Sequence, residues 1–185
     1  MVGEDRSDET VILATRKWIE KAVIGLNLCP FASAVYSKNL VRYFVSKAGS
    51  TQELSTDLIS EMRNLNSNDA SSANFDTTLI IHPFVLLDFL EYCEYLKTAD
   101  SLLKAHQLAG ILQIASFHPL YEFSSDVSGS ITHYTNRSPY PVIHLLKERS
   151  VSEAISKYPE ADQIPEKNVR TLLRLGLAGW KKLMA

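Results

Sequence analysis

The sequence predicts a single α/β domain with a three- or four-stranded, mainly parallel sheet and helices packed on it. Stretches with strand character alternate with helical stretches between residues 41 and 117. Such strand–helix–strand units fold as parallel pairs with right-handed crossovers. The length of 185 residues fits one domain, and a content of 45% hydrophobic and 22% charged residues is typical of a globular chain.

The first third of the chain should contain one helix, one strand and the start of a second helix. Apolar residues at helical spacing predict a helix from Asp8 to about Ile24, behind a loose N-terminus of residues 1–8. Gly25 stands where a left-handed residue commonly ends a helix. β-branched and aromatic residues predict a strand over 41–46.

The middle third should supply a buried strand between two helices. Ser50 and Glu53 have the spacing of a capping box that opens a helix, and a long polar loop should cover 66–75. The apolar residues of 77–82 do not alternate, which predicts a strand buried on both faces. Pro83 is suited to the first position of a helix that runs to about Ala105.

The last third is less regular. A third strand is expected over 111–117, and the long loop 119–140 has no periodicity, which is typical of functional loops. Residues 142–147 are interpreted as a strand, an antiparallel or edge member of the sheet. A capping box at Ser150 should open the next helix, and a last helix should start near Pro165 and be interrupted at Gly176.

Charge and cysteine content narrow the possible functions. The formal net charge of −2 argues against a nucleic-acid or membrane partner. The acidic N-terminus does not resemble a secretory signal, and the apolar runs are shorter than the roughly 18 residues of a membrane span. Cys29 and Cys93 lack metal-site spacing and are interpreted as reduced thiols, so a cytoplasmic protein is expected. The oligomeric state stays open.

Two histidines mark the candidate catalytic edge of the sheet. His82 ends one predicted strand and His118 ends the next, each before a proline. If these strands are parallel, both histidines lie at the carboxyl edge, where open α/β sheets bind ligands. They could transfer protons or hold a metal, or each could simply bond a backbone carbonyl. Pro119 and the polar loop predict an open strand end at His118.

Several residues could bind an anion. Lys47 and Ser50 follow the first strand and open a helix whose free amides favour an anion. In the long loop, Asn136 and Arg137 precede two prolines, and a guanidinium held in this way suits bidentate capture of phosphate or carboxylate. The alternative for Arg137 is a loop anchor that bonds carbonyls.

Reactive thiol and metal chemistry have weaker support. Cys29 follows a helix C-terminus, where the dipole disfavours a thiolate nucleophile. A metal site could in principle use four histidines and a carboxylate, but no two histidines have helical ligand spacing. These residues are His82, His118, His133, His144 and Asp88. The sequence therefore does not predict which metal or cofactor, if any, the protein binds.

Short motifs along most of the chain resemble one family. They are GLNLCPFA (25–32), HP (82–83), SFHP (116–119) and NRSPYP (136–141). The combination resembles the domain-of-unknown-function family numbered fourteen-fifteen, known from bacteria and plants. The resemblance implies a stand-alone small domain and carries no established activity.

Two main functional hypotheses follow. In the first, the protein is an enzyme that acts on a small anionic substrate at the carboxyl edge, with His82 and His118 as acid/base groups or metal ligands and Arg137 orienting the substrate. In the second, the domain binds a small anion or a partner without catalysis, and the histidines are structural. A scaffolding module would instead expose a large apolar patch.

Overall fold

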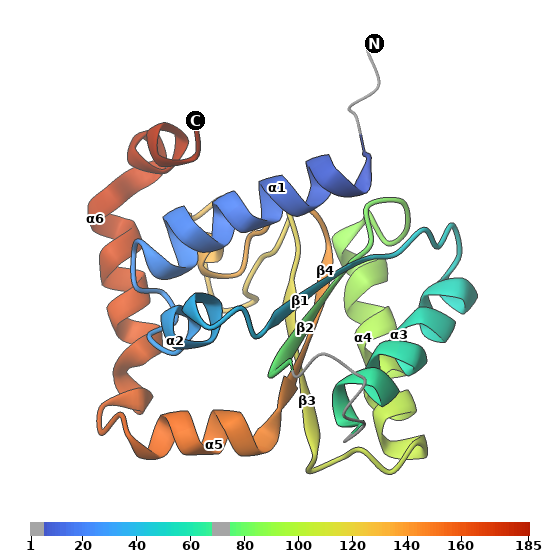
Figure 1. Ribbon diagram of the computed structural model, residues 1–185. Coiled ribbons are helices and arrows are strands. Elements are labelled where there is room, and N and C mark those ends of the chain that lie inside the picture. The colour runs from blue at the N-terminus through green and yellow to red at the C-terminus, as the bar shows by residue number, and fades with distance from the viewer. Residues whose placement is uncertain (1–5, 68–74) are drawn as a thin grey trace.

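The computed structural model of the protein describes residues 6–67 and 75–185 and confirms the α/β class. One four-stranded sheet lies between two groups of helices (Figure 1). The strands are β1 (Val41–Val45), β2 (Thr77–Ile81), β3 (Leu112–Phe117) and β4 (Val142–Lys147). In space their order is β1-β2-β4-β3.

The sheet is mixed, because β4 lies between β2 and β3 and runs opposite to both. Only β1 and β2 form a parallel pair, which corrects the expectation of a mainly parallel sheet. β4 is antiparallel as expected, but it is an interior strand and not an edge strand. Its residues Val142, Ile143 and Leu145 are fully buried, which the apolar character of this segment favours. β1, β2 and β3 nevertheless run in one direction.

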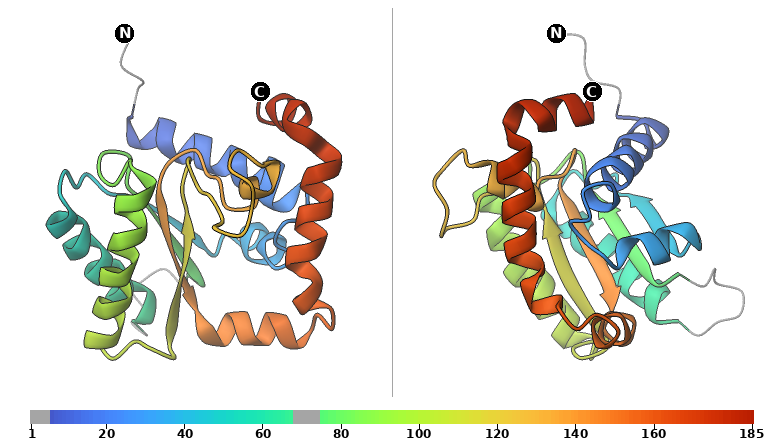
Figure 2. Two further views of the ribbon diagram at one scale, coloured as in Figure 1. Left: turned by 180° about the vertical axis from the view of Figure 1, so that it is seen from behind. Right: turned by 90° about the vertical axis from the view of Figure 1, so that its left-hand side faces the viewer.

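Helices cover both faces of the sheet (Figure 2). α3 (Thr51–Asn66) and α4 (Phe89–Ala105) pack on one face through buried residues such as Leu58 and Tyr92. α1 (Asp8–Trp18), the π-helical turn η1 (Ile19–Ile24) and α6 (Ile164–Met184) pack on the other through Trp18 and Leu172. The shorter helices are α2 (Ala32–Ser37), η2 (Ile131–Thr135), α5 (Glu148–Ser156) and η3 (Ala161–Gln163).

The end of the first helix differs from the expectation. Gly25 has a right-handed φ of −62°, and the left-handed residue is Asn27 at φ 54°. Gly25 is needed for another reason. The π-turn brings the Gly25 N–H to the Glu20 oxygen at 3.0 Å, and a Cβ on Gly25 would lie 2.3 Å from the Lys21 oxygen. The glycine therefore allows a close backbone approach.

Gly25→Ala should lower the free energy of unfolding by about 2 kcal/mol or more, because a backbone atom cannot rotate away from the new methyl group. Urea denaturation followed by tryptophan fluorescence measures the loss. Gly49→Ala is the matched control, since the nearest atom to its new methyl group is a Glu53 carboxylate oxygen at 3.8 Å. Similar stability of the two variants would contradict the steric argument.

The starts of the helices show where local signals succeed and fail. The helix start at Ser50 is confirmed, since Ser50 Oγ accepts from the Glu53 N–H at 3.3 Å. The return bond differs from a capping box, because Glu53 Oε2 accepts from the Gly49 N–H at 2.8 Å and not from the Ser50 N–H. The predicted helix start at Pro83 is wrong: α4 begins at Phe89, capped by Asp88. Residues 82–88 form a loop instead, with Leu86 in a left-handed conformation.

The later helices are closer to the expectation. α5 starts at Glu148, directly after β4, and not at Ser150. α6 is interrupted at Gly176 as predicted, with φ 66° and ψ 170°. Figure 1 shows the bend of α6 toward its C-terminal end. α2 was not expected. No helix within 6–67 and 75–185 combines the length and apolar character needed to cross a bilayer.

Two predicted loose segments fall partly outside the described residues. These are residues 1–5 of the expected N-terminus and residues 68–74 of the expected loop 66–75. Arg6 is described, and its Nη1 donates to the Pro83 oxygen at 2.6 Å. Phe75, at the other end of the loop, packs against the core. The described ends of both segments are therefore attached to the domain.

Candidate functional site

His82 and His118 lie at the same edge of the sheet, as predicted. β2 and β3 both run antiparallel to β4, so their carboxyl ends point the same way. The strands are not neighbours, but both imidazole rings pack on Tyr92, with ring centroids 5.8 Å and 5.0 Å from it. The sequence thus predicts correctly that the fold brings these two histidines to one edge.

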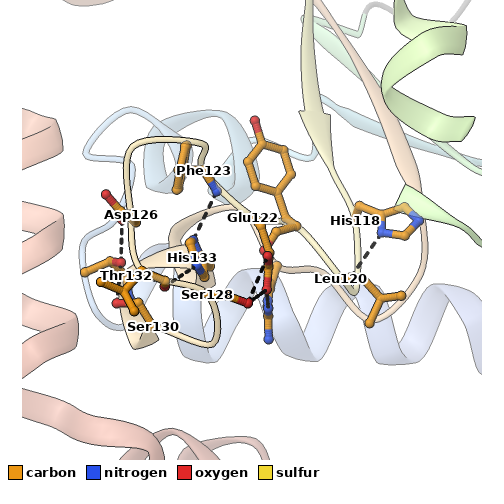
Figure 3. A network of polar contacts seen from close by, with 12 residues as sticks. His118, Leu120, Glu122, Phe123, Asp126, Ser128, Ser130, Thr132 and His133 are labelled. Carbon is orange, nitrogen blue, oxygen red and sulfur yellow. Dashed lines mark hydrogen bonds and ion pairs between the residues drawn. The ribbon is translucent and has the colours of Figure 1, made fainter. Parts of the chain in front are cut away.

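His118 is completely buried, and backbone groups occupy both of its ring nitrogens. The Leu120 N–H donates to Nδ1 at 3.0 Å (Figure 3), and Nε2 donates to the Leu86 oxygen at 3.1 Å. This pattern requires a neutral ring with its proton on Nε2. Burial lowers the pKa of His118, which also favours the neutral form. The expectation of an open strand end is wrong, because the loop of residues 82–88 covers it.

His82 is equally buried but has one nitrogen in use. Its Nδ1 donates to the Val85 oxygen at 3.0 Å, and its Nε2 has no hydrogen-bond partner among the described residues. Burial lowers the pKa of His82 to about 4. The ring is therefore a neutral base at physiological pH, with its acceptor nitrogen directed into the protein interior.

The side chains of Asn136 and Arg137, predicted to bind an anion, are instead bonded to other groups of the protein. Arg137 Nε donates to the Tyr121 oxygen at 3.0 Å, its Nη2 lies 3.6 Å from a Glu122 carboxylate oxygen, and its guanidinium stacks over Tyr134. Asn136 Nδ2 donates to the oxygen of Ser116 at 3.1 Å. These bonds match the alternative in which Arg137 anchors the loop.

A buried histidine organises the rest of this loop. The Phe123 N–H donates to His133 Nδ1 at 3.1 Å, and His133 Nε2 donates to the Val127 oxygen at 3.0 Å. Figure 3 shows this arrangement, with Asp126 accepting a bond from Thr132 beside it. The long loop is thus held by its own polar groups.

The remaining candidates are separate from one another. Lys47 forms an ion pair with Asp8, while Ser50 and Asp88 act as helix N-caps. His144 faces the opposite side of the sheet from His82, bonded to Thr77 Oγ1, and desolvation lowers its pKa to about 4. Burial raises the pKa of the Cys29 thiol, which disfavours a nucleophilic thiolate. Across the described ranges, no three histidine, cysteine or acidic side chains converge as metal ligands would.

A cleft that sequence reasoning missed lies between the turn of residues 26–30 and α6. We call it the α6 cleft. Its volume is about 330 Å³. The lining residues are Leu26, Asn27, Pro30, Tyr158, Ile164, Lys167, Asn168, Arg170, Thr171 and Arg174. The sequence pattern that could have indicated this cleft is the spacing of Lys167, Arg170 and Arg174, which places three cations on one face of a helix.

The wall opposite α6 is fixed by backbone geometry. The turn reverses direction at Asn27, whose φ is 54°. Asn168, buried on α6, donates from Nδ2 to the Leu28 oxygen at 2.8 Å and ties the helix to the turn. The cleft therefore has two walls whose separation is set by a buried hydrogen bond.

The cations of the cleft have weak local partners. Lys167 Nζ forms an ion pair with the Glu160 carboxylate, and Arg170 Nη1 lies 3.7 Å from Glu166 Oε1. Exposed pairs of this kind contribute about 0–1 kcal/mol, so an incoming anion can displace the carboxylates. Arg174 is exposed and forms no ion pair within the described part of the chain. The cleft can therefore receive negative charge.

A family model described as "Protein of unknown function (DUF1415)" matches residues 10–182. The chain belongs to the DUF1415 family. This confirms the resemblance seen in the motifs. No match is found among the curated proteins or the solved structures. Both walls of the α6 cleft and the edge with His82 and His118 lie within the DUF1415 match.

Proposed function

We propose that this DUF1415 protein is a non-catalytic binding domain for a small anionic molecule, which it holds in the α6 cleft. The observation that carries the proposal is the row of Lys167, Arg170 and Arg174 along one wall. Arginine forks bond carboxylate and phosphate in two parallel hydrogen bonds, and a lysine adds a compact charge. Asn27 and Thr171 add neutral hydrogen-bonding groups beside them.

The distribution of charge along the chain supports an anionic ligand. α6 contains five basic residues and one acidic residue, whereas the whole chain has 19 basic and 21 acidic residues. The rest of the chain therefore has a net charge of −6, whereas α6 has a net charge of +4. Such a local positive field attracts anions and raises their association rate.

The chemistry of the lining residues supports binding over catalysis. The ten residues of the cleft include no histidine, cysteine or carboxylate, so its Lys167, Tyr158 and Thr171 have no such group beside them in the lining to activate them as an acid, base or nucleophile. The volume of about 330 Å³ is at the small end of the range for ligand sites. The backbone bonds of His118 support a structural role for that histidine.

Isothermal titration calorimetry with inorganic phosphate and with succinate tests the proposal. We expect at least one of them to bind at millimolar concentration, and Arg174→Gln to weaken that binding about tenfold, because a charge-assisted hydrogen bond is lost. Lys182→Gln is the matched control, since it removes the same charge from α6 outside the cleft. Equal losses in both variants, or no binding to the wild type, would contradict the proposal.

A further inference from the structure

The cations of the α6 cleft form a row of defined length. An α-helix rises 1.5 Å per residue, so Lys167 and Arg174 are about 10 Å apart along the axis. Seven residues are close to two full turns, which places both side chains on the same face, with Arg170 between them. Positive charge is thus available at two points of the cleft and not only at one.

The cleft follows α6 for a considerable length. Its α6 wall extends from Ile164 to Arg174, which is about 15 Å of helix. Apolar side chains belong to both walls, Leu26 and Pro30 to the turn and Ile164 to α6. A cleft of this length with cations at two separate points suits an extended ligand with two negative groups better than a compact anion.

The two ends of the row differ in how far nearby carboxylates neutralise their positive charge. Lys167 is partly neutralised by Glu160 and lies over the Tyr158 ring, with Nζ 5.8 Å from the ring centroid. Arg174 has no carboxylate within salt-bridge distance in the described ranges. The Arg174 end should therefore contribute more to anion affinity than the Lys167 end.

From this geometry we infer that the ligand is a linear dianion, with a negative group at each end and an unbranched chain between them that passes Arg170, a cation already paired with Glu166. The inference rests on the proposed function of the α6 cleft. One anionic group bonds Arg174, the other reaches Lys167, and the chain lies along Leu26 and Pro30. Binding at one end raises the effective concentration at the other, so a dianion of matching length gains affinity from both contacts.

Calorimetric titration with three probes tests this inference. The probes are azelate, which has two carboxylates on a long chain, nonanoate, which has the same chain length with one carboxylate, and succinate, which has two carboxylates on a short chain. We expect azelate to bind at least about tenfold more tightly than either of the others. Arg174→Gln should reduce azelate affinity to that of nonanoate or below, because only the weaker Lys167 end remains, whereas Lys182→Gln should leave azelate affinity unchanged.

Glu160→Gln tests the other end. Removing the carboxylate frees Lys167, so azelate should bind severalfold more tightly to this variant while nonanoate, held at Arg174, changes little. If succinate or nonanoate binds wild type as tightly as azelate and Arg174→Gln weakens it, the cleft binds one anion: the inference fails and the proposed function stands. If none of the three probes binds, the inference fails; if inorganic phosphate does not bind either, the proposed function fails with it.

Discussion

The stability of the protein should fall steeply between pH 6 and pH 5. Burial lowers the pKa of His82 to about 4, and desolvation does the same for His144. In the unfolded chain both rings return to their ordinary pKa near 6.5. Between these values the unfolded state binds more protons than the folded state, so the free energy of unfolding decreases as the pH falls.

The size of this effect follows from the proton difference. A full proton changes the free energy of unfolding by about 1.4 kcal/mol per pH unit, so each histidine contributes about 1 kcal/mol between pH 6 and pH 5. The two together give about 2 kcal/mol, and His118, whose pKa is also lowered, acts in the same direction. Carboxylates contribute little in this window, because they titrate mostly near pH 4.

Urea denaturation at pH 7, 6 and 5 measures the slope of the free energy of unfolding against pH. His144→Gln should remove its own share of the slope, and NMR titration of the wild type should show the His82 and His144 rings neutral at pH 5. The stabilising contribution is complete above pH 6.5 and is lost progressively down to pH 4. A free energy of unfolding that stays constant from pH 7 to pH 5 would contradict this assignment.

His118→Leu should destabilise the protein by about 2–4 kcal/mol. The substitution removes both ring bonds and leaves the buried Leu86 oxygen and the partly buried Leu120 N–H without their partner. Each unsatisfied buried group costs about 1–3 kcal/mol. Leu86 already has the unusual φ of 56°, so the loop of residues 82–88 should loosen when its bond to His118 is lost.

Urea denaturation again gives the free energy, and calorimetry with azelate gives the binding. His106→Leu is the control, because this half-buried residue lies beyond the end of α4 and should change stability by less than about 1 kcal/mol. Azelate affinity of the folded His118→Leu protein should equal that of wild type. A stability loss below about 1 kcal/mol, together with lost binding, would assign His118 to a ligand site.

Local patterns predicted most elements of the fold. The non-alternating apolar run identified β2, the capping box identified the start of α3, and the break at Gly176 was expected. The position of β4 inside the sheet was not predictable in this way, because strand order depends on contacts between distant segments. The start of α4 was misplaced for a similar reason: carbonyls of the preceding loop bond His82 and His118, which competes with the preference of Pro83 for a helix start.

The candidate sites also depend on contacts between distant segments, which local patterns do not predict. The common edge of His82 and His118 follows from chain direction, which the pattern of strands and helices indicates. Their hydrogen bonds to Val85 and Leu86 could not be predicted from sequence spacing. The α6 cleft combines Asn27 with Arg174, nearly 150 residues away in the sequence. It consists of common residue types and contains no histidine or cysteine, so the residue patterns typical of catalytic or metal sites do not indicate it.

The interior position of β4 has a consequence for how the chain is made. β4 is the last strand to be synthesised, and it is the strand that joins β2 to β3. Before residue 147 leaves the ribosome, β2 and β3 have unpaired edges, and such edges are prone to aggregate or to be recognised by chaperones and proteases. The sheet therefore closes only after about four-fifths of the chain has been translated. Products that terminate before Val142 should be degraded and should not accumulate as folded fragments.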